Sequence, residues 1–230
     1  EVNKIMQGSP PPQKYQVSLE NWRKYPHCKW SFSNVRDLIP TAIISESRNK
    51  KIDFNKNLVD LNALVINHKG MKSNLLSILK KCDTDAFLVM QKGILKYEFF
   101  DNFTKENTPH IIFSLSKSIT SLLTGILVSQ KVINLDSPVS TIIEETKGSA
   151  YEHATVRNVL DMNIASRFVE DYTGNEQIFK DYRASTGWDI PKQTKELNFL
   201  GLHDFLSKLP TSDLEHGRKY HYCSPHSDLL

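Results

Sequence analysis

Apolar residues recur with helical spacing in the middle of the chain. Five of them follow the i, i+3, i+4, i+7, i+8 pattern of an amphipathic helix: Ile119, Leu122, Leu123, Ile126 and Leu127. Three apolar residues that favour strands, at 111–113, lead into Ser114. The pattern therefore predicts a helix that begins at Ser114.

Two shorter patterns precede this helix. Four apolar residues share one face over about 73–82, which predicts a helix capped by Ser73 or Asn74. Residues 86–90 and 94–100 are strand-like runs separated by three residues that include a glycine, and this arrangement is typical of a β-hairpin. The first run is apolar on both faces, as in a central strand.

The second half of the chain is less regular. The spacing predicts a helix over 154–160 with Thr155 as its cap, and another over 202–209 that ends at Pro210. Between them, 165–198 is a long polar segment rich in aromatic residues. A loop of that length in a compact domain is typically functional or mobile, and the alternative is a surface excursion with its aromatic side chains tucked in.

The first 70 residues are predicted to form an arm and a wrap. Ser9-Pro10-Pro11-Pro12 favours a stiff, extended backbone. Trp22, Trp30 and Phe32 lie in a polar surround, and such aromatics usually anchor a terminal segment onto a domain. The domain itself is expected to occupy residues 71–230.

Composition places the chain among globular proteins. It has 230 residues, of which 39% are hydrophobic and 10% aromatic, enough for a core. The formal net charge is +3 and the lysines are scattered, so nothing argues for nucleic acid as a partner. No run of about 18 apolar residues occurs, so no transmembrane helix is expected. The chain begins without a signal-like segment and without an initiator Met, and localisation and oligomeric state stay open.

The cysteines and histidines show no metal-binding spacing. Cys28, Cys82 and Cys223 are far apart and form neither a disulfide framework nor a Cys-x-x-Cys pair. The eight histidines include no His-Glu-x-x-His. We expect no metal and no cofactor.

Candidate chemistry lies at the start of the central helix. Residues three apart on a helix share a face, so Ser114 and Lys117 can meet. A serine hydroxyl becomes a nucleophile when a base takes its proton. A lysine can be that base where burial disfavours its ammonium form.

The same Ser-x-x-Lys spacing occurs twice more, at Ser47/Lys50 and Ser77/Lys80. Ser47 lies in a polar run that resembles a solvated loop, and Ser77 lies inside a helical pattern, away from a helix terminus. Only Ser114 combines a lysine one turn on with a helix start, whose free N–H groups and dipole favour developing negative charge.

Several motifs taken together resemble the serine β-lactamase/penicillin-binding superfamily. They are Ser114-Leu115-Ser116-Lys117-Ser118, Leu135-Asp136-Ser137-Pro138-Val139 and Tyr222-Cys223-Ser224-Pro225. More narrowly, Asn21-Trp22, Thr84-Asp85-Ala86, Glu170-Asp171-Tyr172 and Gly187-Trp188 resemble its class C-type branch of esterases and 6-aminohexanoate-dimer (nylon-oligomer) hydrolases.

The resemblance implies an α+β fold of β-lactamase type, in which helices and a helical lobe flank an antiparallel sheet. Residues 71–134 would belong to the α/β lobe and about 135–215 to the helical lobe. The family's third motif, Lys or His followed by Thr or Ser and then Gly, lies on a later strand, and nothing after Tyr222 provides it. The C-terminal strands are therefore expected to be missing from this chain and supplied by a remainder of the same protein.

The resemblance also implies acyl transfer to water, with a small-molecule amide or ester as substrate. Ser114 would be the nucleophile, Lys117 the base and Tyr222 the proton relay, with one oxyanion donor at the Ser114 N–H and the other on the later strand. Tyr222 is preferred to Tyr220 because residues 222–224 form the only Tyr-x-Ser or Tyr-x-Asn in the chain. A tyrosine that merely packs is the alternative.

Tyr172 and Ser224 are the candidate substrate-binding residues. Tyr172 occupies the loop position where nylon-oligomer hydrolases carry a tyrosine that closes over substrate, and a packed loop aromatic is the alternative. Those amidases hold the substrate's amine with an acidic residue, and the matching position here is Arg183, with Asp181 nearby. An esterase or another small-amide hydrolase is therefore an equally open interpretation. A catalytically impaired fragment and a non-catalytic ligand-binding or sensor protein are the alternatives from other classes.

Overall fold

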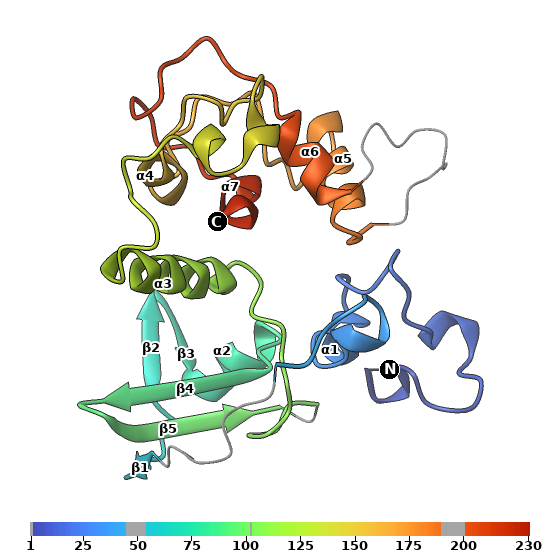
Figure 1. The fold of residues 1–230 in the computed structure, drawn as a ribbon. Coiled ribbons are helices and arrows are strands. Elements are labelled where there is room, and N and C mark those ends of the chain that lie inside the picture. Colours follow the sequence, from blue (N-terminus) through green and yellow to red (C-terminus); the bar gives the residue numbers. More distant parts are fainter. Residues whose placement is uncertain (1, 45–53, 102, 190–200) are drawn as a thin grey trace. The chain divides into compact units, whose positions relative to one another are not determined.

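The computed structural model of the chain describes residues 2–44, 54–101, 103–189 and 201–230. It forms two compact units, Glu1–Ile111 and Ile112–Leu230 (Figure 1). The boundary expected at residue 70 falls inside the first unit, and the assignment of residues to lobes stays a prediction.

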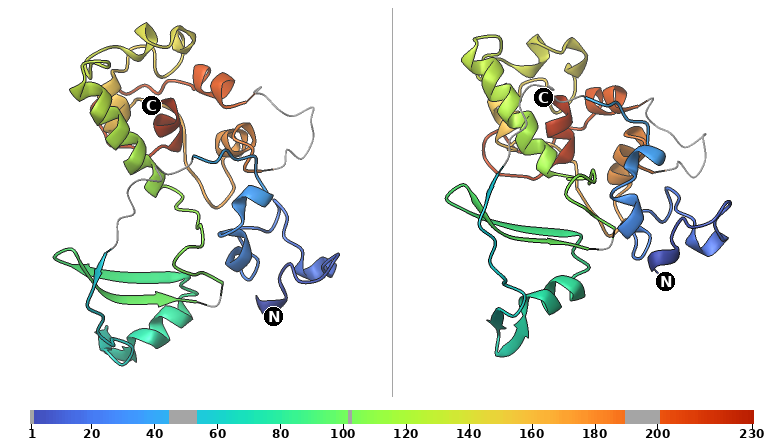
Figure 2. Two further views of the ribbon diagram at one scale, coloured as in Figure 1. Left: turned by 60° about the horizontal axis from the view of Figure 1, so that its bottom comes forward. Right: turned by 90° about the horizontal axis from the view of Figure 1, so that it is seen from below.

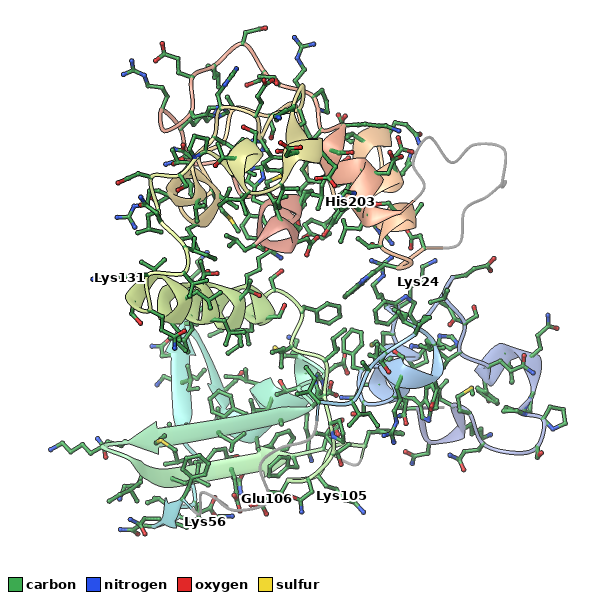
Figure 3. All side chains as sticks on the ribbon, viewed as in Figure 1. Lys24, Lys56, Lys105, Glu106, Lys131 and His203 are labelled. Carbon is green, nitrogen blue, oxygen red and sulfur yellow. The ribbon has the colours of Figure 1, made fainter. Side chains whose placement is uncertain are left out.

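A three-stranded sheet organises the first unit. Strands β4 (Ala86–Gln91) and β5 (Ile94–Phe100) pair antiparallel, which confirms the predicted hairpin (Figure 2). Gly93 in the connection has a φ of +75°, which a residue without Cβ adopts at little cost. Strand β1 (Asn55–Lys56) pairs in parallel with β5, and Lys56 Nζ lies 3.5 Å from the Glu106 carboxylate (Figure 3).

The order of this sheet is β1-β5-β4, so β5 is central and β4 lies at an edge. The interpretation of residues 86–90 as a central strand is therefore wrong, and most of β4 is exposed. Apolar residues on both faces of a strand do not by themselves determine its neighbours, because strand order depends on backbone pairing along the whole sheet.

The helix predicted over about 73–82 is confirmed as α2 (Leu75–Lys81). Asn74 is its cap, since its side chain accepts a 2.8 Å hydrogen bond from the Ser77 N–H. A small antiparallel hairpin of β2 (Val65–His68) and β3 (Met71–Asn74) leads into it. The residues of β3 do not alternate between apolar and polar, so no periodic signal marks this strand in the sequence.

The N-terminal segment contains the short helix α1 (Cys28–Ser31) and packs through its aromatic residues, as predicted. Trp22 is fully buried, and its ring meets that of Phe32 edge to face at 6.2 Å between centroids. Lys29 adds a buried ion pair to both Asp85 and Asp101. Such a pair holds its geometry because a partner left alone would be an uncompensated buried charge.

The second unit is helical. The predicted central helix is α3 (Leu115–Ser129), and Ser114 is its N-cap residue. Helix α4 (Val156–Leu160) begins with a capping box between Thr155 and Asn158, and α6 (Leu202–Ser207) and α7 (Ser224–Leu229) complete the C-terminal part. The helices expected near 154–160 and 202–209 are thus confirmed.

The prediction of one long loop over 165–198 is wrong for residues 177–185, which form α5 (Gln177–Ser185). Its apolar residues are few, and charged residues between them weaken the periodic signal. Two aromatic residues of this segment, Phe168 and Phe179, are buried and their rings meet edge to face at 6.1 Å, whereas Tyr172 is 71% exposed. Residues 190–198 lie outside the described part of the chain.

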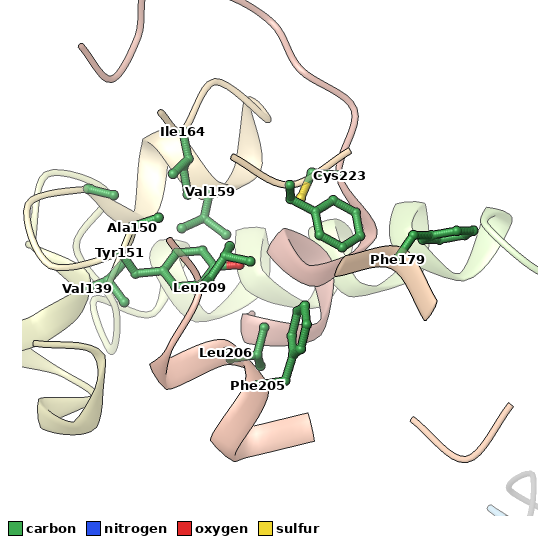
Figure 4. Close-up of a cluster of buried hydrophobic side chains, with 12 residues drawn as sticks. Val139, Ala150, Tyr151, Val159, Ile164, Phe179, Phe205, Leu206, Leu209 and Cys223 are labelled. Carbon is green, nitrogen blue, oxygen red and sulfur yellow. The ribbon is translucent and has the colours of Figure 1, made fainter. Parts of the chain in front are cut away.

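One hydrophobic core of the second unit includes residues of α4, α5 and α6 (Figure 4). Its buried members are Val139, Ala150, Tyr151, Ala154, Val159, Ile164, Phe168, Phe179, Phe205, Leu206, Leu209 and Cys223. Burial of so many apolar side chains supplies most of the stability of such a unit, at about 25 cal/mol per Å² of apolar surface. Cys223 belongs to this core and immediately follows Tyr222, so the core fixes the backbone that carries that tyrosine.

The apolar stripe that predicts α3 is not buried in the structure. Leu122 and Leu123 are 64% and 56% exposed, whereas the buried residue of this helix is Thr124. Helical spacing therefore predicted the helix correctly. It did not determine which of its faces is covered.

His226 of α7 makes the second unit sensitive to acid. The side chain is fully buried, Nδ1 lies 3.1 Å from the Tyr151 hydroxyl, and Nε2 has no hydrogen-bond partner among the described residues. Burial, and to a smaller extent the nearby His221 and His216, lower the pKa of His226 from its usual 6.5 to about 3. The folded chain therefore holds this imidazole neutral.

Below about pH 6.5 the unfolded chain binds a proton at His226 that the folded chain does not bind until about pH 3. The free energy of unfolding should fall across this window as the pH drops, by up to about 1.4 kcal/mol per pH unit. Urea denaturation from pH 7 to pH 4 measures this slope. In His226→Gln, which cannot titrate, the slope should become flatter. The exposed His203→Gln is the control for removing a histidine, and an unchanged slope in His226→Gln would contradict the assignment.

Candidate active site

Ser114 lies at the N-terminus of α3 with helical backbone angles (φ −66°, ψ −9°), and its side chain caps nothing. Within the described residues its N–H donates to no acceptor. Phe113, just before it, has a φ of +43°, which residues with a side chain seldom adopt and which recurs at functional sites. The hydroxyl and N–H of Ser114 are thus both unused by the helix itself.

The three predicted catalytic residues come together at the Ser114 hydroxyl. Lys117 Nζ donates to Ser114 Oγ at 3.1 Å, and the Tyr222 hydroxyl donates to the same oxygen at 2.8 Å. Lys117 Nζ also lies 5.4 Å from the centre of the Tyr222 ring, within cation–π range. Tyr222 is 108 positions away from Ser114 along the chain, so this meeting depends on tertiary structure.

This arrangement can transfer protons in either direction. Lysine Nζ and a phenol can each donate a proton, and each can accept one when deprotonated. Activation of Ser114 requires one of the two hydrogen bonds to reverse, so that the serine proton moves to a neutral Lys117 Nζ or a Tyr222 phenolate. A nucleophile held by two such groups has both a base and a proton relay within reach.

The other described Ser-x-x-Lys lacks this arrangement. Ser77 and Lys80 are exposed on α2, and no hydrogen bond joins their side chains in the parts of the chain that the structure describes. Ser47 and Lys50 lie outside the described residues. Spacing alone therefore does not bring the two groups together.

The two predicted substrate-binding residues meet at Glu170. The Tyr172 hydroxyl makes a short hydrogen bond to Glu170 Oε1. Ser224 donates its N–H to Oε2 at 2.8 Å and its hydroxyl to Oε1 at 2.9 Å. The sequence presented Glu170 only as part of the Glu170-Asp171-Tyr172 motif, and its convergence with Ser224 had no sequence signal because 54 positions separate the two.

A compact turn holds Tyr172 in place. Asp171 accepts the Thr173 N–H at 2.8 Å and the Asn175 N–H at 2.9 Å, and a hydrogen bond from the Thr173 hydroxyl is the main cause that lowers the pKa of Asp171. The Tyr172 ring meets Phe179 of α5 edge to face at 5.2 Å between centroids. Tyr172 is nevertheless 71% exposed, so it is available to a ligand.

Arg183 and Asp181, the residues at or near the predicted amine-binding position, both have partners of their own. Arg183 Nη2 lies 2.5 Å from Asp189 Oδ1, and its guanidinium lies over the Phe179 ring. Asp181 accepts a 2.8 Å hydrogen bond from Gln177. Arg183 carries no carboxylate and Asp181 has one oxygen engaged by Gln177, and the match to an amine-binding acid stays a prediction.

A hydrogen bond joins α5 to α7. The Tyr182 hydroxyl donates to Asp228 Oδ2 at 2.5 Å. Asp228 follows Tyr222 by six positions, and its contact with Tyr182 has no signal in the sequence because 46 positions separate the two. Among the described residues no group of three His, Cys, Asp or Glu side chains could hold a metal ion. No described helix is long and apolar enough to cross a membrane.

A model of the beta-lactamase family matches residues 101–230, more than half of the chain. The chain belongs to the beta-lactamase family. This match includes Ser114, Lys117, Tyr172, Tyr222 and Ser224 within its bounds, and it confirms the family suggested by the motifs.

Two relatives narrow the placement within the beta-lactamase family. A 6-aminohexanoate-dimer hydrolase of Paenarthrobacter ureafaciens is 28% identical over 215 residues, which are 94% of this chain and 52% of that protein. A solved structure from Bacillus anthracis, provisionally described as a 6-aminohexanoate-dimer hydrolase, matches with a TM-score of 0.85 at 22% identity. It covers 95% of this chain and 57% of the other. The chain spans about half the length of these relatives. The structural match confirms the predicted β-lactamase-like α+β fold.

The second Ser-x-x-Lys provides a matched control for the role of Lys117. Lys117→Ala should slow the labelling of Ser114 by a fluorophosphonate by about 10² or more, since it removes the base. In Lys117→Arg the guanidinium stays protonated and cannot act as a base, so labelling of Ser114 should be slowed in this variant as well. Lys80→Ala should label at the unchanged rate, as measured by intact mass spectrometry over time. Equal labelling of Lys117→Ala and Lys80→Ala would remove Lys117 from the mechanism.

Proposed function

We propose that this protein is a serine hydrolase that cleaves a small-molecule amide or ester through an acyl-enzyme. The observation that carries the proposal is that Ser114 Oγ lies within hydrogen-bond distance of both Lys117 Nζ and the Tyr222 hydroxyl. The relationship to a 6-aminohexanoate-dimer hydrolase supports the same class of reaction.

In the first step, Ser114 Oγ attacks the substrate carbonyl carbon while its proton passes to Lys117 or Tyr222. The carbonyl oxygen becomes an oxyanion, which the Ser114 N–H at the start of α3 is placed to stabilise. The bond to the leaving amine or alcohol then breaks, and Tyr222 gives that group a proton.

In the second step, water attacks the acyl-enzyme carbonyl after losing a proton to the same pair of groups. The bond from carbon to Ser114 Oγ breaks, the serine recovers its proton, and a carboxylic acid leaves. Atoms and protons balance over the two steps without an external reagent. This cycle requires neither a metal nor a cofactor.

The substrate proposed is a small amide or ester rather than the 6-aminohexanoate dimer itself. Arg183 occupies the position where nylon-oligomer hydrolases place an acid, and it is paired with Asp189. A cation there would repel the free amine of such a dimer at neutral pH. A neutral or anionic substituent on the substrate fits this position better.

The nucleophile can be identified directly. The chain should form a covalent adduct with a fluorophosphonate at Ser114, located by peptide mass spectrometry, and Ser114→Ala should lose it. Hydrolysis of a p-nitrophenyl ester should fall by about three orders of magnitude or more in Ser114→Ala, because nothing replaces the nucleophile. Ser77→Ala is the control and should keep both adduct and turnover.

The labelling and hydrolysis measurements distinguish a hydrolase from a ligand-binding or sensor protein. An adduct at Ser114 without turnover supports a ligand-binding or sensor protein with a reactive serine. Ester hydrolysis of equal rate in the wild type and Ser114→Ala would overturn the proposal.

A further inference from the structure

A pocket lies between two segments of the second unit that are far apart in the sequence. The segment 163–166 pairs antiparallel with Thr211, and its backbone accepts a 3.1 Å hydrogen bond from the Ser212 N–H. The chain then returns to the start of the same segment, where the Gly217 N–H donates to the Asn163 carbonyl at 2.8 Å. The loop between these two attachments and the segment 163–166 line a pocket of about 200 Å³, which we call the loop pocket. A cavity needs only about 15 Å³ to hold a water molecule, so the loop pocket has room for an organic ligand.

The floor of the loop pocket is apolar. Ile164 and Ala165 line it and are only 2% and 4% exposed, and Ile164 also belongs to the hydrophobic core of the second unit (Figure 4). Leu214, which is 59% exposed, adds an apolar side chain at the rim. A hydrocarbon chain that covers these side chains is stabilised because apolar surface is removed from water on both partners.

The polar side chains near this floor have hydrogen-bond donors to offer. Asn163 Oδ1 already accepts from Asn158 Nδ2 at 2.9 Å, so the unused group of Asn163 is its NH₂. The Ser166 hydroxyl is buried beside the Cys223 thiol and has no oxygen or nitrogen partner within the described residues. A buried hydroxyl in this situation gains a hydrogen bond from a ligand that accepts its proton.

The charges at the rim favour an anion. Glu215 lines the loop pocket but forms an ion pair with Arg218 at 2.8 Å, whereas Lys219 is exposed and makes no ion pair with any described residue. His216 lies against the floor and adds no charge, because its Nδ1 accepts the Ala165 N–H at 3.0 Å and must therefore be unprotonated. Burial lowers the pKa of His216, in agreement with this neutral form. The one uncompensated charge on the wall of the loop pocket is thus the ammonium group of Lys219.

We propose that the loop pocket binds the anion of a short-chain carboxylic acid, with the carboxylate at Lys219 and the hydrocarbon chain over Ile164 and Leu214. A carboxylate only accepts hydrogen bonds, which matches the unused donors of this pocket, and a short alkyl chain matches its apolar floor. None of the lining residues is assigned to the proposed reaction at Ser114. The inference does not depend on the hydrolase function, although the acid that such a reaction releases belongs to the same chemical class.

Titration of the full chain with sodium hexanoate tests this site. Calorimetry should show saturable binding, and the backbone amide resonances of Ala165 and Ser212 should shift in nitrogen-15 NMR spectra along the same titration. Hexylamine and 1-hexanol have the same alkyl chain and should bind at least about tenfold more weakly, because neither brings a negative charge to Lys219.

Variants at the rim separate the two parts of the ligand. Lys219→Gln should raise the Kd of hexanoate about tenfold, the size of one charge-assisted hydrogen bond, and Lys219→Arg should keep most of the affinity. Lys180→Gln, the same change at an exposed lysine of α5 that does not line the pocket, should leave the Kd as it is. Leu214→Ala should weaken hexanoate about threefold and should not weaken acetate, which has no chain to cover the floor.

The opposite results overturn the inference. They are the absence of saturable hexanoate binding, equal Kd values in Lys219→Gln and Lys180→Gln, or tighter binding of hexylamine, which would make Glu215 the group that selects the ligand. A Kd that changes in Ser114→Ala but not in Lys219→Gln would assign hexanoate to the Ser114 site instead. Circular dichroism melting of each variant shows that a lost affinity is not a loss of folding. The hydrolase proposal is tested separately by the adduct at Ser114 and stands or falls without the loop pocket.

Discussion

The position of Tyr222 depends on the burial of the short helix that follows it. Cys223, Ser224, Pro225 and His226 are all buried, and α7 packs against α3 and α4 within the second unit. A six-residue helix has little stability of its own, so its place is determined by the core around it. Because α3 carries Lys117 and begins at Ser114, the contact between α7 and α3 brings the Tyr222 phenol to the Ser114 hydroxyl.

The polar groups around this contact share a limited number of protons. Ser114 Oγ accepts from Lys117 and Tyr222, while Glu170 accepts from Tyr172 and Ser224. In each cluster a hydroxyl can donate or accept, and its neighbours decide which. The first cluster has to reverse a bond for catalysis, whereas the carboxylate of the second fixes its bonds in one direction. The proposed reaction uses the first network, and the second holds Ser224 and Tyr172 in place beside it.

Two Ser-x-x-Lys pairs with the same spacing differ in whether their side chains meet. Ser114/Lys117 and Ser77/Lys80 have the same spacing on confirmed helices, yet only the first pair is joined by a hydrogen bond among the described residues. What distinguished them in the sequence was the helix start at Ser114. A residue at an N-terminus has a free N–H and an unobstructed side chain. The expectation that Ser77 lies away from a helix terminus is wrong, since it lies in the first turn of α2, but its N–H is used by the Asn74 cap and its side chain is exposed.

The sequence by itself determined the local elements and the chemistry they can carry: the helix from Ser114, the hairpin over 86–100, the Thr155 cap, and through its motifs the beta-lactamase family. These features depend on side chains within a few positions of one another, so a linear pattern records them. Only the tertiary structure decided the edge position of β4, the exposure of the α3 stripe, and the meeting of Glu170 with Ser224. Each of these depends on which distant surfaces pack together, and neither spacing nor composition encodes that directly.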